Sequence, residues 1–178
     1  NPKRAYSTYF RTCTTDDVQG PFAAKYLLDA GIKEAATIHD KKAYGQGLVE
    51  AFTKACTDGG GTIVAAETIN PDDKDFSAVI TKVKAANPKA VYYGGEHPQS
   101  GPLSQQAKNA GLNVPVMGGD GMFDAAYIEL AGASSEGDLV TSVGAPTESL
   151  ASAKSFVEAY EKGGYQGGYA AYGMYSYD

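Results

Sequence analysis

The pattern that most constrains the fold is a regular alternation of short apolar runs with longer amphipathic stretches. The apolar runs are rich in Val, Ile, Ala, Thr and Tyr, as buried strands are. They lie at residues 5–12, 34–40, 62–69, 90–95, 114–119 and 137–143. Strict alternation with short links indicates parallel strands joined by crossover helices. The sequence therefore predicts an α/β fold of three layers, αβα, with a mainly parallel, open, Rossmann-like sheet.

The stretches between the apolar runs carry apolar residues at helical spacing. They cover residues 16–31, 44–61, 75–88, 100–111, 123–132 and 149–164. In the first of them, we expect the core-facing residues to be Phe22, Tyr26, Leu27 and Ala30. In the later ones, the expected core residues are Leu48, Ala51, Phe52, Ala55, Phe76, Val79, Ile80, Val83, Phe156, Val157 and Tyr160. With 43% hydrophobic residues, the 178-residue chain can bury a normal core as one domain.

Charge and hydropathy exclude two kinds of partner. The chain has 15 Lys and Arg against 21 Asp and Glu, a formal net charge of −6, and its basic residues are scattered. Nucleic acid is bound by clustered basic residues, so we expect no nucleic-acid partner. No apolar run approaches the ~20 residues of a membrane helix, so we expect no membrane insertion by this segment.

Sequence signatures of enzymes and metal sites are missing. The chain has no G-x-S-x-G elbow, no phosphate loop and no complete G-x-G-x-x-G after a strand. His39, His97, Cys13 and Cys56 lack metal-site spacing. We therefore expect no catalytic residue, metal or cofactor. Cys56 shares a helical face with Phe52 and fits a core position, although a disulfide to Cys13 in an oxidising compartment is the alternative.

Polar side chains follow three of the predicted strands. The first strand is followed by His39, Asp40 and Tyr44, the second by Glu96 and His97, and the third by Asp120. In open parallel sheets, ligands bind beyond the carboxyl ends of the strands, so these residues are site candidates. Each also has a structural explanation. The two aspartates could cap the next helices, Tyr44 could pack inward, Glu96 could be a solvated loop acid, and the histidines could be structural.

The third of these clusters lies in the stretch "VPVMGGDGMFD", residues 114–124. Its apolar run ends at paired glycines, and the single carboxylate of Asp120 follows at once. Gly118, Gly119 and Gly121 would let the backbone approach a guest without a Cβ clash. The residue types leave two readings open, a helix cap or a carboxylate that holds a positively charged group of a ligand.

Four stretches together resemble a known family. They are "YFRTCTTDDVQGPFAAKYLLD", "ATIHDKKAYGQGLVEAF", "DKDFSAVITKVKAANPKAVYYGGEHPQSG" and "VPVMGGDGMFD". In this order they resemble the branched-chain amino acid (Leu/Ile/Val-type) substrate-binding proteins of ABC transporters, from Tyr9 to about Val143 and then weakly to the end. That family has the type I periplasmic-binding-protein fold, with a ligand held between two α/β lobes. By resemblance, residues 1–178 are the second lobe, with 1–10 and 169–178 near the hinge crossovers.

The resemblance also implies site residues. The family's tyrosine at a helix start matches Tyr44, and its acid that takes the ligand's α-ammonium matches Asp120. A position that is aromatic in the Leu/Ile/Val binders is Glu96 here, which would suit a polar or cationic ligand side chain. Tyr172 or Tyr175 would line the cleft.

The function implied by the resemblance is that of an extracytoplasmic solute-binding protein. It would bind an amino acid or related amine-bearing solute, deliver it to an ABC permease and catalyse no reaction. The alternative is a ligand-binding sensor or receptor module of the same fold.

Overall fold

The computed structural model describes residues 8, 11–166, 169, 172 and 173. The chain forms two compact units, one of Asp16–Thr141 and one of Asn1–Thr15 together with Ser142–Asp178. The first unit holds the sheet and five of the α-helices. None of the described helices has both the length and the apolar character that a membrane crossing demands.

The sheet has five strands, all parallel, in the spatial order β2-β1-β3-β4-β5. Their bounds are β1 (Glu34–His39), β2 (Thr62–Thr68), β3 (Ala90–Gly94), β4 (Val116–Gly118) and β5 (Leu139–Val140). The predicted α/β class and parallel sheet are thus confirmed. The apolar run at 5–12 lies mostly outside the described residues.

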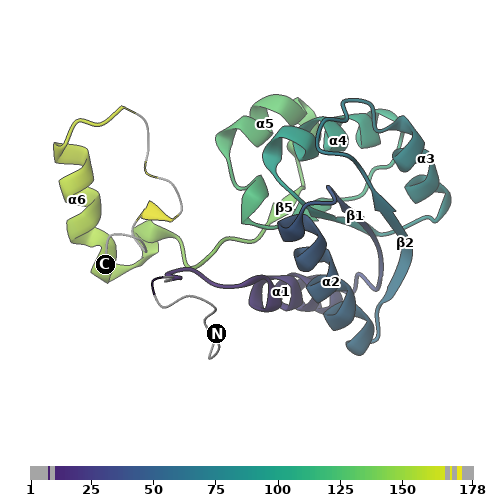
Figure 1. Cartoon of the computed structure of the whole chain (residues 1–178), viewed down its shortest axis with the longest axis horizontal. Helices are drawn as coiled ribbons and strands as arrows, with labels where there is room; N and C mark the ends of the chain where they lie inside the picture. The colour runs from purple at the N-terminus through teal and green to yellow at the C-terminus, as the bar shows by residue number, and fades with distance from the viewer. Residues whose placement is uncertain (1–7, 9–10, 167–168, 170–171, 174–178) are drawn as a thin grey trace. The chain divides into compact units, whose positions relative to one another are not determined.

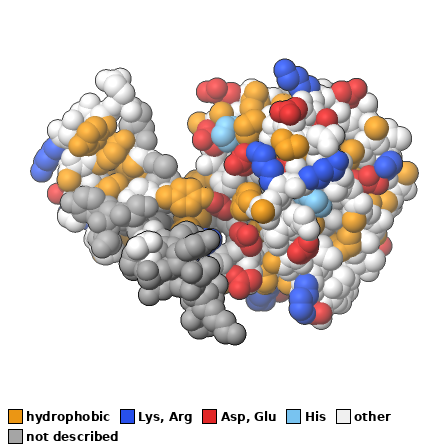
Figure 2. Space-filling view, viewed as in Figure 1, with side chains coloured by type: hydrophobic (Ala, Val, Ile, Leu, Met, Phe, Trp, Pro, Cys, Tyr) orange, Lys and Arg blue, Asp and Glu red, His pale blue; other side chains and the backbone are white. Residues whose placement is uncertain are grey.

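Helices cover both faces of the sheet, which confirms the three layers (Figure 1). On one face lie α1 (Asp16–Asp29) and α2 (Ala43–Asp58), and on the other lie α3 (Ser77–Ala85), α4 (His97–Asn109) and α5 (Ala125–Ala131). Two short 3-10 turns, η1 (Asp120–Met122) and η2 (Gly132–Ser135), flank α5. Acidic and basic side chains are interspersed over the visible face of this unit (Figure 2).

The predicted inner face of α1 was wrong. Phe22 is 64% exposed and Tyr26 49% exposed, Ala30 is exposed too, and only Leu27 of the expected set is buried. The face that packs inward instead has three small residues, Gly20, Ala23 and Ala24, beside Gln19 and Leu27. A Cβ at Gly20 would lie 2.7 Å from the backbone nitrogen of Phe52, so α1 and α2 approach too closely for large side chains between them. Close helix packing therefore overrides the hydrophobic pattern here.

The remaining core predictions for this unit mostly hold. Leu48, Phe52, Phe76, Ile80 and Val83 are buried, whereas Ala51, Ala55 and Val79 are partly buried. The ring of Phe52 stacks on that of Tyr92 across the interface of α2 and β3, at a centroid distance of 3.9 Å. Cys56 is a buried free thiol, as the core reading predicted, and Cys13 is also free.

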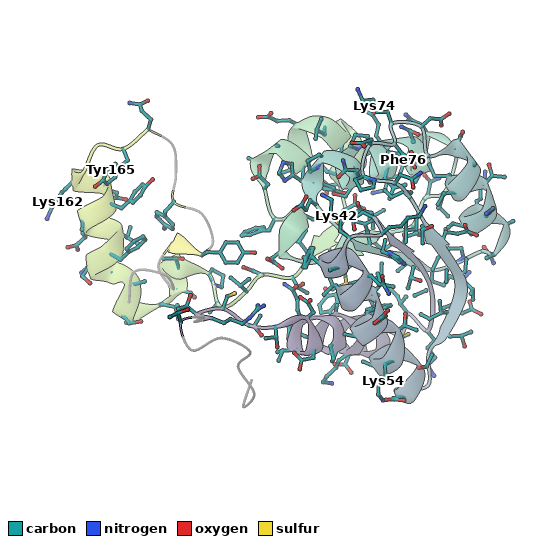
Figure 3. The ribbon with its side chains drawn as sticks, in the orientation of Figure 1. Lys42, Lys54, Lys74, Phe76, Lys162 and Tyr165 are labelled. Carbon is teal, nitrogen blue, oxygen red and sulfur yellow. The ribbon has the colours of Figure 1, made fainter. Side chains whose placement is uncertain are left out.

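The other unit contains α6 (Lys154–Lys162), preceded by the turns η3 (Thr147–Ser149) and η4 (Ala151–Ala153). Aromatic rings gather beside α6. Tyr160 contacts Tyr165, which Figure 3 labels, and Tyr169 contacts both Phe156 and Tyr160. No residue of α6 is fully buried, so the expected core positions Phe156, Val157 and Tyr160 are only partly covered.

Candidate functional site

Three loops meet at the carboxyl edge of the sheet, those that follow β1, β3 and β4. Gly121 marks the meeting point, because a Cβ there would lie 2.7 Å from the carbonyl oxygen of Gly95 and 3.0 Å from the ring of Tyr44. Gly95 follows β3, and Tyr44 is the second residue of α2. The edge where the sequence placed the candidate site is therefore a real junction of these loops.

Tyr44 and Asp120 form a hydrogen-bonded pair at this junction. The Tyr44 hydroxyl donates to Asp120 Oδ1 at 3.1 Å and accepts from the Gly121 N–H at 3.2 Å. Burial raises the pKa of Tyr44 above its usual range, and the neighbouring Asp120 carboxylate raises it further. The Tyr44 hydroxyl therefore stays protonated and can hold the Asp120 carboxylate in place. The two residues are 76 positions apart in the sequence.

The helix-cap reading of Asp120 is wrong. Asp120 is itself the first residue of η1, and the residue in the capping position is Gly119, which has no side chain. The cap of the next helix is Asp124, whose Oδ1 accepts the Ala126 N–H at 2.8 Å. Within the described residues, Asp120 forms no ion pair, so its charge remains available to a partner outside the chain.

The glycines around Asp120 allow the protein's own parts to pack closely. A Cβ at Gly119 would lie 2.6 Å from the Tyr44 hydroxyl and 2.6 Å from the Leu48 side chain. Both distances are shorter than real Cβ contacts, so a side chain at this position would push the loop away from α2. Gly119 is thus needed for the pair of Tyr44 and Asp120 to form, independently of any role in the approach of a ligand.

Glu96 forms an ion pair with Lys42, at 3.0 Å between Nζ and Oε2. The two side chains are 46% and 52% exposed, for Lys42 and Glu96 in that order. The hydrogen bond to Glu96, reinforced by its charge, raises the pKa of Lys42. Lys42, labelled in Figure 3, lies just before α2 and two residues from Tyr44, and Glu96 lies just before α4, so the pair spans the loops after β1 and β3. Glu96 is therefore half of a donor-and-acceptor pair and not a lone carboxylate.

Two of the remaining polar candidates accept hydrogen bonds from the backbone of the loop after β1. Asp40 is fully buried and its Oδ1 accepts the Lys42 N–H at 3.0 Å, although Lys42 and not Asp40 occupies the capping position of α2. His39 Nδ1 accepts the Lys41 N–H at 3.1 Å. His97 is the first residue of α4 and half-buried. Tyr172 is 39% exposed, and Tyr175 lies outside the described residues.

The sequence reading missed Asp16 and Tyr92 as neighbours of this site. The Tyr92 hydroxyl is buried without a hydrogen-bond partner, and burial raises the pKa of Tyr92. The charges of Asp16 and Asp120 raise it further. The available signal for Asp16 was the acid that opens the predicted helix at this residue.

The described residues contain no group of three or more His, Cys, Asp or Glu side chains that could hold a metal ion. The Asp120 carboxylate, with one oxygen held by the Tyr44 hydroxyl, can accept a hydrogen bond from an N–H group such as that of an ammonium. The arrangement is thus suited to binding a cationic group.

Comparison with known proteins shows to which family the chain belongs. The family model described as "Periplasmic binding protein" matches residues 1–177. The chain belongs to the periplasmic binding protein family. This periplasmic binding protein chain is 41% identical over 157 residues to a Leu/Ile/Val-binding protein homolog of Brucella melitensis, which covers 88% of the chain. It is also 41% identical over 139 residues, 78% of its length, to a leucine-, isoleucine-, valine-, threonine- and alanine-binding protein of Pseudomonas aeruginosa.

The solved structures agree. The leucine-binding protein LivK of Thermotoga maritima superposes with a TM-score of 0.82 at 29% identity, over 93% of this chain and 48% of that one. The chain spans 42% of the Brucella protein and 37% of the Pseudomonas protein. The type I periplasmic-binding-protein fold expected from the sequence is therefore confirmed, for a chain about half the length of its relatives.

Proposed function

We propose that this periplasmic binding protein is the solute-binding component of an ABC importer and binds an amino acid or a related amine-bearing solute. The observation that carries the proposal is Asp120, a carboxylate fixed by Tyr44 at the sheet edge and without an ion-pair partner among the described residues. An α-ammonium is the common cationic group that such a carboxylate fits. The names of the relatives, which bind Leu, Ile and Val, support an amino acid.

The site is half of a binding cleft on this proposal. Residues 1–178 are the second lobe, with residues 1–10 and 169–178 near the hinge crossovers, and the compact unit Asp16–Thr141 carries the site. Periplasmic binding proteins are a standard example of hinge closure around a ligand. Closure would bring the other lobe's contacts to the carboxylate of the ligand and remove water from the cleft. Tyr172 and Tyr175 stay predicted cleft residues. The protein acts outside the cytoplasm and hands its solute to a permease.

The ligand's side chain is polar on this proposal. Glu96 Oε2 is bound to Lys42, and a carboxylate and an ammonium each keep further hydrogen-bonding capacity. The pair can therefore accept from and donate to one ligand side chain, such as an alcohol or a carboxamide. Because Lys42 already balances the charge of Glu96, a cationic ligand side chain gains less binding free energy here than it would beside an unpaired carboxylate.

Calorimetry of the two-lobed protein against a panel of amino acids tests the function. We expect one-to-one binding, with polar neutral amino acids preferred to Leu, Ile and Val. Residues 1–178 alone are the control. They should bind at about 1 mM or more weakly, near −4 kcal/mol, because the other half of the site is missing. Micromolar binding by this chain alone would contradict the half-site model.

A further inference from the structure

The turn between β1 and α2 has a strained residue at its centre. Lys41 has a φ of 63°, a left-handed conformation that residues other than glycine rarely adopt. Its N–H donates to His39 Nδ1 at 3.1 Å, and its ammonium donates to Asn70 Oδ1 at 2.7 Å. Such a conformation persists only where the surrounding structure determines it, and it is common where a ligand is clamped. The turn therefore keeps a fixed shape up to its next residue, Lys42.

Asp40 fixes the backbone of Lys42 within this turn. The buried Asp40 Oδ1 accepts the Lys42 N–H at 3.0 Å, and the Lys42 carbonyl accepts the Gln46 N–H at 2.9 Å. Both backbone polar groups of Lys42 are thus bonded. A side chain that caps a helix accepts from the second or third helical residue, whereas Asp40 accepts from the residue before the helix. The bond from Asp40 therefore places Lys42 itself.

Asp40 is held in turn by the neighbouring elements. Its N–H donates to the Gly94 carbonyl at 3.1 Å, which joins the end of β1 to the end of β3. A Cβ at Gly45 would clash with both Asp40 Oδ1 and that carbonyl oxygen, so the first turn of α2 lies directly against them. Glu96 follows Gly94 by two residues. The Asp40 residue thus links the parts of the fold that carry Lys42 and Glu96.

We propose that Asp40 is a positioning residue for the side-chain selectivity of the site and acts through the ion pair of Lys42 and Glu96. The inference rests on the proposed function. Both side chains of the pair are about half exposed, and such pairs gain little over the entropy that their long side chains lose. A fixed backbone at Lys42 lowers that loss, because its ammonium can reach fewer places. Asp40 thereby keeps one donor and one acceptor side by side for an alcohol or a carboxamide group of the ligand.

Calorimetry of the two-lobed protein with leucine and asparagine tests the proposal. Their side chains have nearly the same shape, apolar in one and a carboxamide in the other. Asp40→Ala should lower the ratio of the leucine to the asparagine dissociation constant about five- to tenfold, the size expected for one lost hydrogen bond. Asp40→Asn should keep the ratio, because its amide oxygen can still accept the Lys42 N–H. An Asp40→Ala protein with an unchanged ratio would overturn the proposal, since a merely structural residue affects both solutes alike.

Two further substitutions sharpen this test. Asp75→Ala removes the same kind of bond, from Asp75 Oδ1 to the Ser77 N–H at 2.9 Å, at the start of α3 and should leave the ratio unchanged. In a Lys42→Met protein, adding Asp40→Ala should change the ratio by less than about twofold, because the residue through which Asp40 acts is gone. A full five- to tenfold change in that protein, or an equal change for Asp75→Ala, contradicts the proposal.

Backbone order at Lys42 provides a measurement that needs no substitution. In the two-lobed protein without ligand, the NMR order parameter of the Lys42 N–H should match that of rigid backbone, about 0.85. A value below about 0.6, as in a flexible loop, would overturn the proposal even if every variant folded poorly. Absence of amino-acid binding by the unaltered protein would instead refute the proposed function, which the order parameter does not test.

Discussion

At the scale of single residues, two aspartates four positions apart have different places in the structure. Asp120 is held by Tyr44, whereas Asp124 caps α5. We expect Asp120→Asn in the two-lobed protein to weaken amino-acid binding by about 2–5 kcal/mol, since a desolvated ammonium loses its charged partner. That corresponds to roughly 30- to several-thousand-fold in affinity, measurable by calorimetry. The melting temperature without ligand should barely change.

Asp124→Ala is the matched control for that experiment. Loss of the cap should cost about 0.5–2 kcal/mol of stability and leave the affinity for amino acids unchanged. An Asp120→Asn protein with wild-type affinity would remove Asp120 from the site. An Asp124→Ala protein with the larger loss of affinity would transfer the ligand contact to the neighbouring turn.

Glu96 carries the prediction on side-chain selectivity. In the two-lobed protein, Glu96→Tyr removes the acidic partner of Lys42. It also introduces an aromatic side chain, which the resemblance implies for Leu/Ile/Val binders at this position. We expect the preference to move towards Leu, Ile and Val, seen as a changed order of dissociation constants in a competition assay. Lys54→Tyr removes half of an exposed ion pair on α2, away from the sheet edge, and serves as the control. An unchanged order for Glu96→Tyr would mean that Glu96 faces only solvent.

At the scale of elements, one carboxylate ties four parts of the fold together. Asp138 is 2% exposed and pairs with Lys108 of α4 at 2.6 Å. It also accepts hydrogen bonds from Ser104 of α4, from Tyr127 of α5 and from the Val116 N–H of β4. Every acceptor position of the Asp138 carboxylate is thus used within the protein. These bonds hold the start of β5 beside α4, α5 and β4.

Asp138→Asn should therefore be strongly destabilising. It leaves the Lys108 ammonium, only 17% exposed, without its counter-charge, a change that typically costs about 3–5 kcal/mol. Urea denaturation of residues 1–178 measures the loss as a lower midpoint. The double substitution Asp138→Asn with Lys108→Met should lose clearly less than the sum of the single ones. Additive losses would show that the two side chains are not coupled.

The elements were also the most predictable part of the fold. The alternation of apolar runs predicted β1 to β5 at their places along the chain, because it reflects a sheet buried on both faces. It did not predict their spatial order, β2-β1-β3-β4-β5. The inward face of α1 was not predictable from hydrophobic spacing. Gly20 lets α1 approach α2 so closely that Phe22 must point outward, and that approach is a property of the pair of helices.

At the scale of the whole molecule, the buried tyrosines predict a loss of stability in alkali. Burial raises the pKa of Tyr44, Tyr92, Tyr93 and Tyr127 above the usual range. A pKa that is higher in the folded than in the unfolded state contributes stability below the unfolded value, about 10, and that stability is lost as the pH rises. The free energy of unfolding should therefore fall above about pH 10.

Phenolate absorbance followed together with circular dichroism checks this prediction. The four buried hydroxyls should ionise only as the secondary structure is lost, in one late step. Ionisation of all 13 tyrosines before any change in circular dichroism would contradict it.

The candidate site was predictable as a place but only partly as a set of contacts. The rule for parallel sheets located Tyr44, Glu96 and Asp120 at one edge, and the resemblance suggested their roles. Neither indicated that Lys42 neutralises Glu96 or that the Tyr44 hydroxyl holds Asp120, because both depend on how loops from different strands meet. The roles of these residues towards a ligand remain predictions.

The hydrogen bond between Tyr44 and Asp120 also gives the protein a built-in optical reporter. The sequence contains no Trp, so its ultraviolet emission comes from tyrosine alone and is not masked by indole. A phenol that donates to a carboxylate has a different excited state from one that does not. A solute whose ammonium engages Asp120 would perturb that bond at its acceptor end. Solute capture should therefore be visible in the tyrosine fluorescence of the unlabelled protein, and Tyr44→Phe should abolish most of the change.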